Sequence, residues 1–239
     1  MGLFPNQPQA AIGDSGCIHV VFGIADTVQY AGSTNGNTFE KSRLAFQVPN
    51  MALGMRRGPR IASTGDVIVV TAIGGKIGKG RMAIFLHGYR DMYLTSSVNQ
   101  GMSFTPATRI GQGTWSLDAC PMDGGMLMVN GTGVVETVWR RDGNIYMTAK
   151  SLPEDLLGRG QQPWIAATAN GTCIVWTSER EGDLMLRAPS SPHAKKIGEN
   201  ARDPMVVSSA NGKGSVVCCW EAKAGGDTKI IVQQIDAGE

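Results

Sequence analysis

The stretch QPWIAATANGTCIVWTS, residues 162–178, decides the fold that this sequence predicts. A short apolar segment follows Pro163, a turn contains Asn170 and Gly171, and a second apolar segment comes after the turn. Asn-Gly between two apolar runs is the strongest short signal for a β-hairpin, because both turn residues can take positive φ. The stretch therefore predicts two antiparallel strands directly behind a proline.

The same plan recurs along the chain, each time followed by a third apolar strand and a weaker fourth stretch. Repeats of roughly 40–50 residues built from short strands are typical of β-propeller blades. Four of the copies have a proline at their second position, and the copy at residues 114–130 does not. In that copy we expect MDGG to be the hairpin turn and MLMVN the second strand. The four further copies are QPQAAIGDSGCIHVVFG (7–23), GPRIASTGDVIVVTA (58–72), TWSLDACPMDGGMLMVN (114–130) and DPMVVSSANGKGSVVCCWEA (203–222).

The five copies predict an all-β protein, a five-bladed β-propeller of four-stranded antiparallel blades, with residues 1–239 as a single domain. The last copy supplies only three strands before the chain ends. The segment GLFPNQP (2–8) is similar to the fourth-strand stretch LLGRGQQP (156–163). We therefore expect the N-terminal strand to complete the last blade and close the ring, which leaves only short, protected strand edges.

Composition narrows the function classes. The net charge is +2 and only 18% of residues are charged, so we expect neither a nucleic-acid nor a membrane partner. The five cysteines include no Cys-x-x-Cys pair and the three histidines are scattered, which predicts no metal site and no cofactor. The N-terminal segment is not a signal peptide, but an exported domain behind a start Met would look the same, so a secreted or periplasmic location stays open.

The segment SSVNQGMSF, residues 96–104, resembles the Asp box of sialidases and related BNR-repeat propellers, whose pattern is Ser-x-Asp-x-Gly-x-Thr-Trp/Phe. A poorer copy is GSTNGNTF (32–39), with Gly32 and Thr34 in place of the Ser and Asp. Asn and Ser side chains bond the amides of such turns, and glycine permits positive φ. The matching residues are Ser97, Asn99, Gly101, Ser103 and Phe104 in the first segment and Gly36, Thr38 and Phe39 in the second.

The resemblance places the box between the third and fourth strands of a blade, away from the active face, with its aromatic residue filling the gap between blades. It also implies arginines that grip a carboxylate and a carboxylic acid that assists hydrolysis. Arg57 and Arg60, in GMRRGPRIA, would grip an acidic group of the ligand. A solvated basic turn is the alternative for these two arginines.

Three more residues complete the predicted site. Trp164 occupies the position after the proline that Arg60 occupies in its own blade, and would stack on a sugar ring, although packing between blades is the alternative. Asp26, in a loop between second and third strands, and Glu136, in VVETVW, are the candidate catalytic carboxylates, because paired carboxylates are the usual means of cleaving a glycoside. Glu136 facing solvent is the alternative for that residue.

We therefore expect a sialidase-like propeller that binds a glycan or an acidic small molecule at its central funnel, with hydrolysis left open. The alternative is a non-catalytic scaffold that binds a protein partner through the Gly- and Lys-rich insert of residues 73–90, predicted as an extended loop. Trp139, Trp176 and Trp220 recur at the ends of second strands, which predicts core positions for all three.

Overall fold

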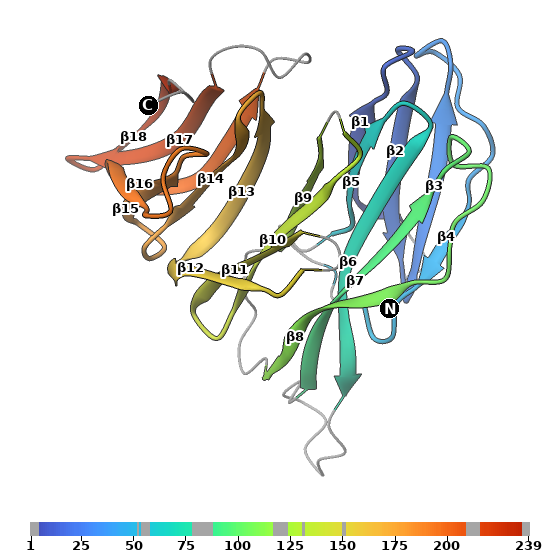
Figure 1. The fold of residues 1–239 in the computed structure, drawn as a ribbon, viewed down its shortest axis with the longest axis horizontal. Helices are drawn as coiled ribbons and strands as arrows, with labels where there is room; N and C mark the ends of the chain where they lie inside the picture. Colours follow the sequence, from blue (N-terminus) through green and yellow to red (C-terminus); the bar gives the residue numbers. More distant parts are fainter. Residues whose placement is uncertain are drawn as a thin grey trace. The chain divides into compact units, whose positions relative to one another are not determined.

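The structure is a computed structural model that describes residues 5–51, 53, 58–77, 88–116, 124–130, 132–149, 152–208 and 216–235. Strands and their turns make up these residues (Figure 1). Within these ranges there is no helix long and apolar enough to cross a membrane. The chain divides into two compact units, Met1–Gly125 and Met126–Glu239, and each is described by itself.

Unit 1 contains two four-stranded antiparallel sheets, in which the strands pair in sequence order. We call the sheets blade 1 and blade 2. Blade 1 consists of β1 (Asn6–Ile12), β2 (Ile18–Ile24), β3 (Thr27–Ser33) and β4 (Arg43–Gln47). Blade 2 consists of β5 (Arg60–Thr64), β6 (Val67–Ile77), β7 (Gly88–Ser97) and β8 (Thr108–Ser116).

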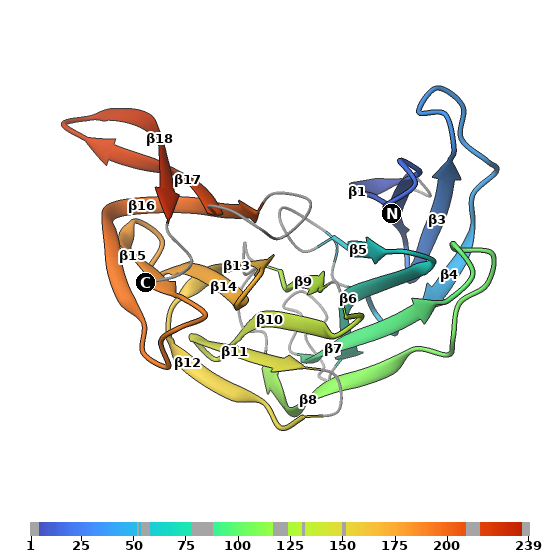
Figure 2. The ribbon, with the colours of Figure 1, turned by 45° about the horizontal axis from the view of Figure 1, so that its top comes forward.

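Unit 2 contains one four-stranded sheet, blade 3, and one six-stranded sheet. The long strand β16 bends (Figure 2), so its first part, up to Ala201, ends blade 4 and its second part, from Ala201, begins blade 5. Blade 3 consists of β9 (Met126–Val129), β10 (Val135–Arg141), β11 (Asn144–Ala149) and β12 (Asp155–Arg159). The six-stranded sheet consists of β13 (Gln161–Thr168), β14 (Gly171–Thr177), β15 (Gly182–Arg187), β16 (Lys195–Ser208), β17 (Val216–Ala224) and β18 (Asp227–Ile235).

A β-bulge with a proline marks the start of three first strands. The pairing register shifts between Asn6 and Gln9, between Gln161 and Trp164, and between Arg202 and Met205. Proline lacks an N–H group to donate to a sheet, and a bulge is one of the few places inside a sheet that tolerates it. The residues before the three prolines, Gln7, Gln162 and Asp203, have φ values of 54°, 55° and 51°.

Neighbouring first strands lie alongside each other in the same direction, joined by side chains. In unit 1 the Ile61 amide donates to Gln9 Oε1 at 2.9 Å, and the Gly65 amide donates to Asp14 Oδ2 at 2.7 Å. The first bond lies near the starts of β1 and β5 and the second lies beyond their ends. The starts of the two strands therefore lie at one end of the unit, and the β1–β2 and β5–β6 turns lie at the other.

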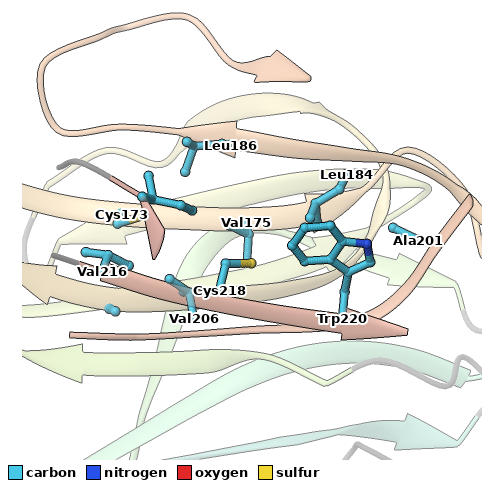
Figure 3. Close-up of a cluster of buried hydrophobic side chains, with 11 residues drawn as sticks. Cys173, Val175, Leu184, Leu186, Ala201, Val206, Val216, Cys218 and Trp220 are labelled. Carbon is cyan, nitrogen blue, oxygen red and sulfur yellow. The ribbon is translucent and has the colours of Figure 1, made fainter. Parts of the chain in front are cut away.

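Apolar side chains fill the space between neighbouring blades of each unit. Cys173, Val175 and Leu184 of blade 4 face Val216 and Cys218 of blade 5 (Figure 3). The prediction that three tryptophans belong to the core is confirmed, since their exposed fractions are at most 6%. These residues are Trp139, Trp176 and Trp220.

The turn between β7 and β8 has the bonds expected for the segment 96–104. Ser97 Oγ accepts the Gly101 amide at 2.9 Å, and Asn99 Oδ1 accepts the Ser103 amide at 3.0 Å. Gly101 has a φ of 82°, which glycine adopts without strain. The Phe104 ring meets the Tyr30 ring of blade 1 edge to face, with centroids 5.4 Å apart, so the aromatic residue does fill a gap between two blades.

The second such turn, between β3 and β4, differs from its predicted alignment. Ser33, not Gly32, supplies the hydroxyl, whose Oγ accepts the Gly36 amide at 3.0 Å. Asn35, not Thr34, supplies the side-chain acceptor, and Asn35 Oδ1 accepts the Thr38 amide at 2.9 Å. The prediction was wrong because this turn is one residue shorter, and its alignment on Gly36 moved both polar positions by one.

Two further predictions about strands need correction. The copy at residues 114–130 was placed one strand too early, because Met126–Val129 is the first strand of blade 3 and the hairpin turn follows at Asn130, whose Oδ1 accepts the Val134 amide at 2.9 Å. The insert of residues 73–90 is not all loop. Its ends continue β6 and β7, with Ile73 opposite Met92 and Gly75 opposite Arg90.

Two predictions stay open. Residues 78–87, the rest of the insert, lie outside the described residues, so a protein partner for this insert remains a prediction. Of the segment 2–8, which was predicted to complete the last blade, residues 2–4 also lie outside them, and Asn6 already begins β1 of blade 1. Blade 5 supplies three described strands, as expected, and closure of the ring by the N-terminal strand remains a prediction, as does the single domain.

Candidate functional site

The predicted arginine site is described in part. Arg57 lies outside the described residues. Arg60 begins β5, directly after Pro59, and is half-buried. Its Nε donates to the Gly125 carbonyl at 3.3 Å, so part of the guanidinium serves the fold of unit 1. The rest of this side chain lies at the end of the unit where the first strands begin.

Asp26 lies at the same end of unit 1. It occupies the tight turn between β2 and β3, next to Ala25 with a φ of 49°, and its side chain is exposed. Its Oδ1 accepts the Met51 amide at 2.9 Å, and its carbonyl accepts the Val48 amide at 2.9 Å. One oxygen of the carboxylate is thus engaged in holding the chain that leaves blade 1.

Trp164 follows the bulge of β13 in unit 2 and is half-buried. It packs against both core clusters of the unit, the one between blades 3 and 4 and the one between blades 4 and 5. The packing of Trp164 between blades, which was the alternative to a role in sugar stacking, is therefore present. The part of the indole that stays exposed lies near the start of a first strand.

Glu136 lies at the other end of unit 2. It is the second residue of β10 and pairs with Met128, near the end of β9. Its Oε2 accepts a hydrogen bond from Thr172 Oγ1 at 2.6 Å, at the start of β14. Because β10 and β14 run opposite to β13, Glu136 and Trp164 lie at opposite ends of the unit, and the structure does not bring them together.

Sequence reasoning missed a charged group at the start of the first strand of blade 5. Arg202 Nε donates to Glu221 Oε2 at 3.0 Å, and the guanidinium lies 3.7 Å from Glu181 and 3.6 Å from Asp203. Lys223 Nζ lies 2.7 Å from Glu181, and this hydrogen bond lowers the pKa of the Glu181 carboxyl. The hydrogen bond with Glu221 likewise raises the pKa of Arg202.

Within this group, Gln162 orients Asp203. The Gln162 side chain is only 5% exposed. Its Nε2 donates to Asp203 Oδ1 at 2.8 Å, and its Oε1 accepts the Asp203 amide at 3.0 Å. A sequence signal existed, because Asp203 is the only charged residue among those that precede the prolines of the four copies. The oriented carboxylate of Asp203 is a group that could bind sugar hydroxyls or assist glycoside cleavage.

A pocket of about 450 Å³ opens at the opposite end of unit 1, between the turns of blades 1 and 2. We call it the Tyr30 pocket. Buried His19 and Tyr30 form its floor, with His19 Nδ1 and Tyr30 Oη 2.8 Å apart and the Tyr30 hydroxyl donating to the Gln100 carbonyl at 3.1 Å. The lining residues also include Cys17, Gly32, Thr34, Glu40, Arg43 and Asp66.

Burial sets the ionisation of the pocket floor. It lowers the pKa of His19 and raises the pKa of Tyr30 to about 12, so both groups are neutral at pH 7. The Tyr30 proton goes to Gln100, so His19 Nδ1 must donate to the Tyr30 oxygen. The other ring nitrogen, Nε2, then carries a lone pair.

No protein-family model matches this sequence, and no curated protein matches it either. Solved structures do. The Hadza microbial sialidase Hz136 matches with a TM-score of 0.60 and 13% identity, over 98% of this chain and 57% of that chain. The alpha-L-arabinofuranosidase arb93a of Fusarium graminearum matches with a TM-score of 0.57 and 11% identity, over 96% of this chain and 76% of that chain.

A GH43_1 enzyme of Xanthomonas citri complexed with xylotriose matches with a TM-score of 0.51 and 10% identity, over 98% of this chain and 88% of that chain. The chain has the fold of the propeller glycosidases. At these identities the likeness shows the fold alone, and this chain spans little more than half the length of the sialidase. The predicted all-β fold of four-stranded antiparallel blades is confirmed, whereas the Asp-box family remains a prediction.

Proposed function

We propose that this chain binds a carbohydrate at the end of its blades where the first strands begin, as propeller glycosidases of the same fold suggest. The observation that carries the proposal is the match of 96–98% of the chain to a sialidase, an arabinofuranosidase and a GH43_1 enzyme complexed with xylotriose. The three differ in the sugar that their names imply. A carbohydrate is therefore supported as the ligand class, and no particular sugar is.

The residues at this end of the blades support the proposal in each unit. In unit 2, Trp164 offers the exposed part of an indole, a flat apolar surface of the kind that packs on the apolar face of a sugar ring. Asp203 offers a carboxylate that Gln162 holds in place. In unit 1, Arg60 and the exposed Asp26 lie at the corresponding end and would supply a donor and an acceptor to sugar hydroxyls.

Hydrolysis is the finer part of the proposal. Cleavage of a glycoside needs an acid and a second carboxylate that acts as base or nucleophile. Asp26 in unit 1 and Asp203 and Glu221 in unit 2 are the carboxylates at this end of the blades. Glu136 is a weaker candidate, because it lies at the other end of unit 2 and accepts a hydrogen bond from Thr172.

The test combines binding and turnover. Purified protein is applied to a glycan array and incubated with fluorogenic α-sialoside, β-xyloside and α-L-arabinofuranoside. We expect binding to at least one glycan class, and loss of the stacking surface in Trp164→Ala should weaken it about tenfold, the equivalent of a stacking contact of roughly 1.4 kcal/mol. Turnover that Asp26→Asn or Asp203→Asn abolishes would support hydrolysis.

The controls separate binding from folding. Trp164→Phe keeps an aromatic face and should retain most of the affinity, whereas Leu156→Ala changes an exposed residue of blade 3 and should retain all of it. If the wild-type chain binds no glycan of the array, the proposal is wrong. If it binds glycans but cleaves none of the three glycosides, the chain is a binding protein for those sugars.

A further inference from the structure

We propose that the Tyr30 pocket is a second ligand site, which binds a neutral sugar ring at the end of unit 1 opposite to Arg60. This site does not depend on the proposed function, because it shares no residue with it. Its volume of about 450 Å³ is in the range of small-molecule sites. Two features argue for the ligand: a hydrogen-bond acceptor at the pocket floor and a rim whose charged groups already have hydrogen-bond partners.

Glycine at two positions leaves room around His19 and Tyr30. A Cβ on Gly32 would lie 2.9 Å from the Tyr30 hydroxyl, and a Cβ on Gly13 would lie 2.9 Å from His19 Nε2. Neither glycine has a positive φ, so the backbone does not demand glycine there, in contrast to Gly101. Each glycine makes room for the polar side chain that packs against it, and Gly32 also lines the pocket.

The pocket floor presents an acceptor. His19 is only 3% exposed, and its Nδ1 proton is used by Tyr30. Among the residues that the structure describes, none forms a hydrogen bond to Nε2. Nε2 is not among the fully buried side-chain atoms that lack a hydrogen bond, so it is accessible to solvent at the pocket floor. A hydroxyl group of a ligand that donates a hydrogen bond can take the place of water there.

The rim favours a ligand without charge. Arg43 pairs with Glu40, and Arg43 Nη1 also reaches the Gly101 carbonyl at 3.4 Å. Asp66 Oδ1 accepts Gln100 Nε2 at 2.7 Å. An anionic ligand would face two carboxylates and a neutral imidazole, and a cationic ligand would have to compete with Arg43 and Gln100 for its partners.

Sugar hydroxyls suit this combination of groups. A hydroxyl donates one hydrogen bond and accepts two. It can donate to His19 Nε2 or to the remaining lone pairs of Asp66 and Glu40, and accept from Arg43. A ring with several adjacent hydroxyls matches a pocket that has donors and acceptors side by side, which a charged group of one kind does not.

The experiment is a titration followed by two-dimensional NMR, with backbone amides and the His19 ring nitrogens observed. The probes are methyl β-D-xylopyranoside, sodium acetate and methylammonium chloride at equal ionic strength. We expect the sugar to shift His19 Nε2 and the amides of Gly32 and Gln100 with a Kd in the range of about 1–10 mM. Acetate and methylammonium should leave these signals in place.

Two variants test the site. Asn places its amide nitrogen where His has Nδ1 but has no atom at Nε2, so His19→Asn keeps the bond to Tyr30 and removes the acceptor. Thr34→Trp fills the pocket from an exposed position of its rim. Each should raise the Kd by about tenfold or more. Lys229→Ala, an exposed change in unit 2, is the control and should bind as the wild type does.

The outcomes distinguish this site from the proposed glycan site, because the Trp164 indole N–H reports on the latter in the same spectra. If the sugar moves only the Trp164 signal, the proposed function stands and the Tyr30 pocket is not a sugar site. If acetate or methylammonium moves the pocket signals instead, or if Thr34→Trp binds unchanged, the inference is likewise wrong. No shift in the pocket up to about 100 mM sugar also overturns it.

Discussion

At the scale of single residues, Tyr30 does more for unit 1 than its place in a third strand suggests. Its ring packs in the core between blades 1 and 2 and meets Phe104. Its hydroxyl joins His19 to the Gln100 carbonyl. One side chain thus combines apolar packing with two hydrogen bonds that link blade 1 to blade 2. A substitution of Tyr30 that removes its buried ring would therefore remove these hydrogen bonds as well.

The stability of unit 1 should depend on pH through His19. Burial lowers the pKa of His19 below the ordinary value of 6.5. As the pH falls below 6.5, His19 is therefore protonated in the unfolded chain before it is protonated in the folded chain. The stability contributed by neutral His19 is therefore present above pH 6.5 and is lost as the pH falls through the folded pKa. We expect the free energy of unfolding, measured with urea from pH 7.5 to 5, to fall less steeply in His19→Asn than in the wild type.

The matched control for this experiment is His193→Asn, because the His193 side chain is exposed. Neighbouring titratable groups, namely Cys17, Glu40, Arg43 and Asp66, are unchanged in both variants. Equal pH slopes for the wild type and His19→Asn would contradict the account of a neutral, buried imidazole.

How far individual site residues could be predicted depends on what decides their environment. Composition and position marked Arg60, Asp26 and Trp164, and each lies at the end of a blade where a first strand begins. Gln162 and Asp203 were missed, because their importance comes from a hydrogen bond between two blades. The two residues are 41 positions apart in the sequence. Pairings between blades follow from packing and have no period along the chain.

At the scale of elements, the turns between third and fourth strands show how one design tolerates a change in length. In both turns a serine oxygen accepts a glycine amide, and an asparagine oxygen accepts the amide of a later Ser or Thr. The shorter turn keeps these bonds with one residue fewer. The bonds are local, so the sequence predicted their chemistry, but the alignment of the shorter turn could not be read from letters alone.

Two glycine substitutions separate backbone strain from packing in these turns. Gly36 and Gly101 both have positive φ, 73° and 82°. A Cβ on Gly36 would meet only Ile18 Cδ1, at 3.5 Å, whereas a Cβ on Gly101 would overlap the Tyr30 ring. We expect Gly36→Ala to cost about 1 kcal/mol of unfolding free energy, the price of left-handed backbone, and Gly101→Ala to cost about 1–3 kcal/mol more.

Urea denaturation of the two variants measures the difference, and Tyr30→Phe in the Gly101→Ala background serves as a check. Phe lacks the hydroxyl but keeps the ring, so the extra cost of Gly101→Ala should persist there if the ring is what the new methyl group meets. Equal costs for Gly36→Ala and Gly101→Ala would show that the Tyr30 ring moves aside freely.

The strand β9, which sequence reasoning placed second in its blade instead of first, also shows that a local signal does not decide its own position. Residues 114–131 contain two turn signals, Asp-Gly at 123 and Asn-Gly at 130, and the first is predicted as the hairpin turn. The structure uses the second, with Asn130 accepting the amides of Thr132 and Val134. Both signals satisfy the local chemistry of a turn, so only the pairing of β9 with β10 decides between them.

At the scale of the whole molecule, neighbouring blades within each unit share a core, so they should unfold together. Blades 4 and 5 share β16 in one six-stranded sheet. Their common core contains Cys173 of blade 4 and Cys218 of blade 5, which are 1% and 0% exposed. This arrangement follows from the repeat plan only in part, since the sequence predicted separate four-stranded blades and gave no sign that one strand would serve two.

Thiol labelling can test whether blades 4 and 5 open as one body. Burial raises the pKa of Cys173 and of Cys218 to about 12, so both are unreactive protonated thiols in the folded chain. We expect N-ethylmaleimide at pH 7, followed by peptide mass spectrometry, to label half-buried Cys17 and Cys219 first. Cys173 and Cys218 should then react slowly at one common rate, because either thiol becomes accessible only when the shared core opens.

Labelling in urea, where these four cysteines should react alike, is the control. A Cys218 that reacts much faster than Cys173 would mean that β17 separates from blade 4 by itself, and that the six-stranded sheet is not a single cooperative unit.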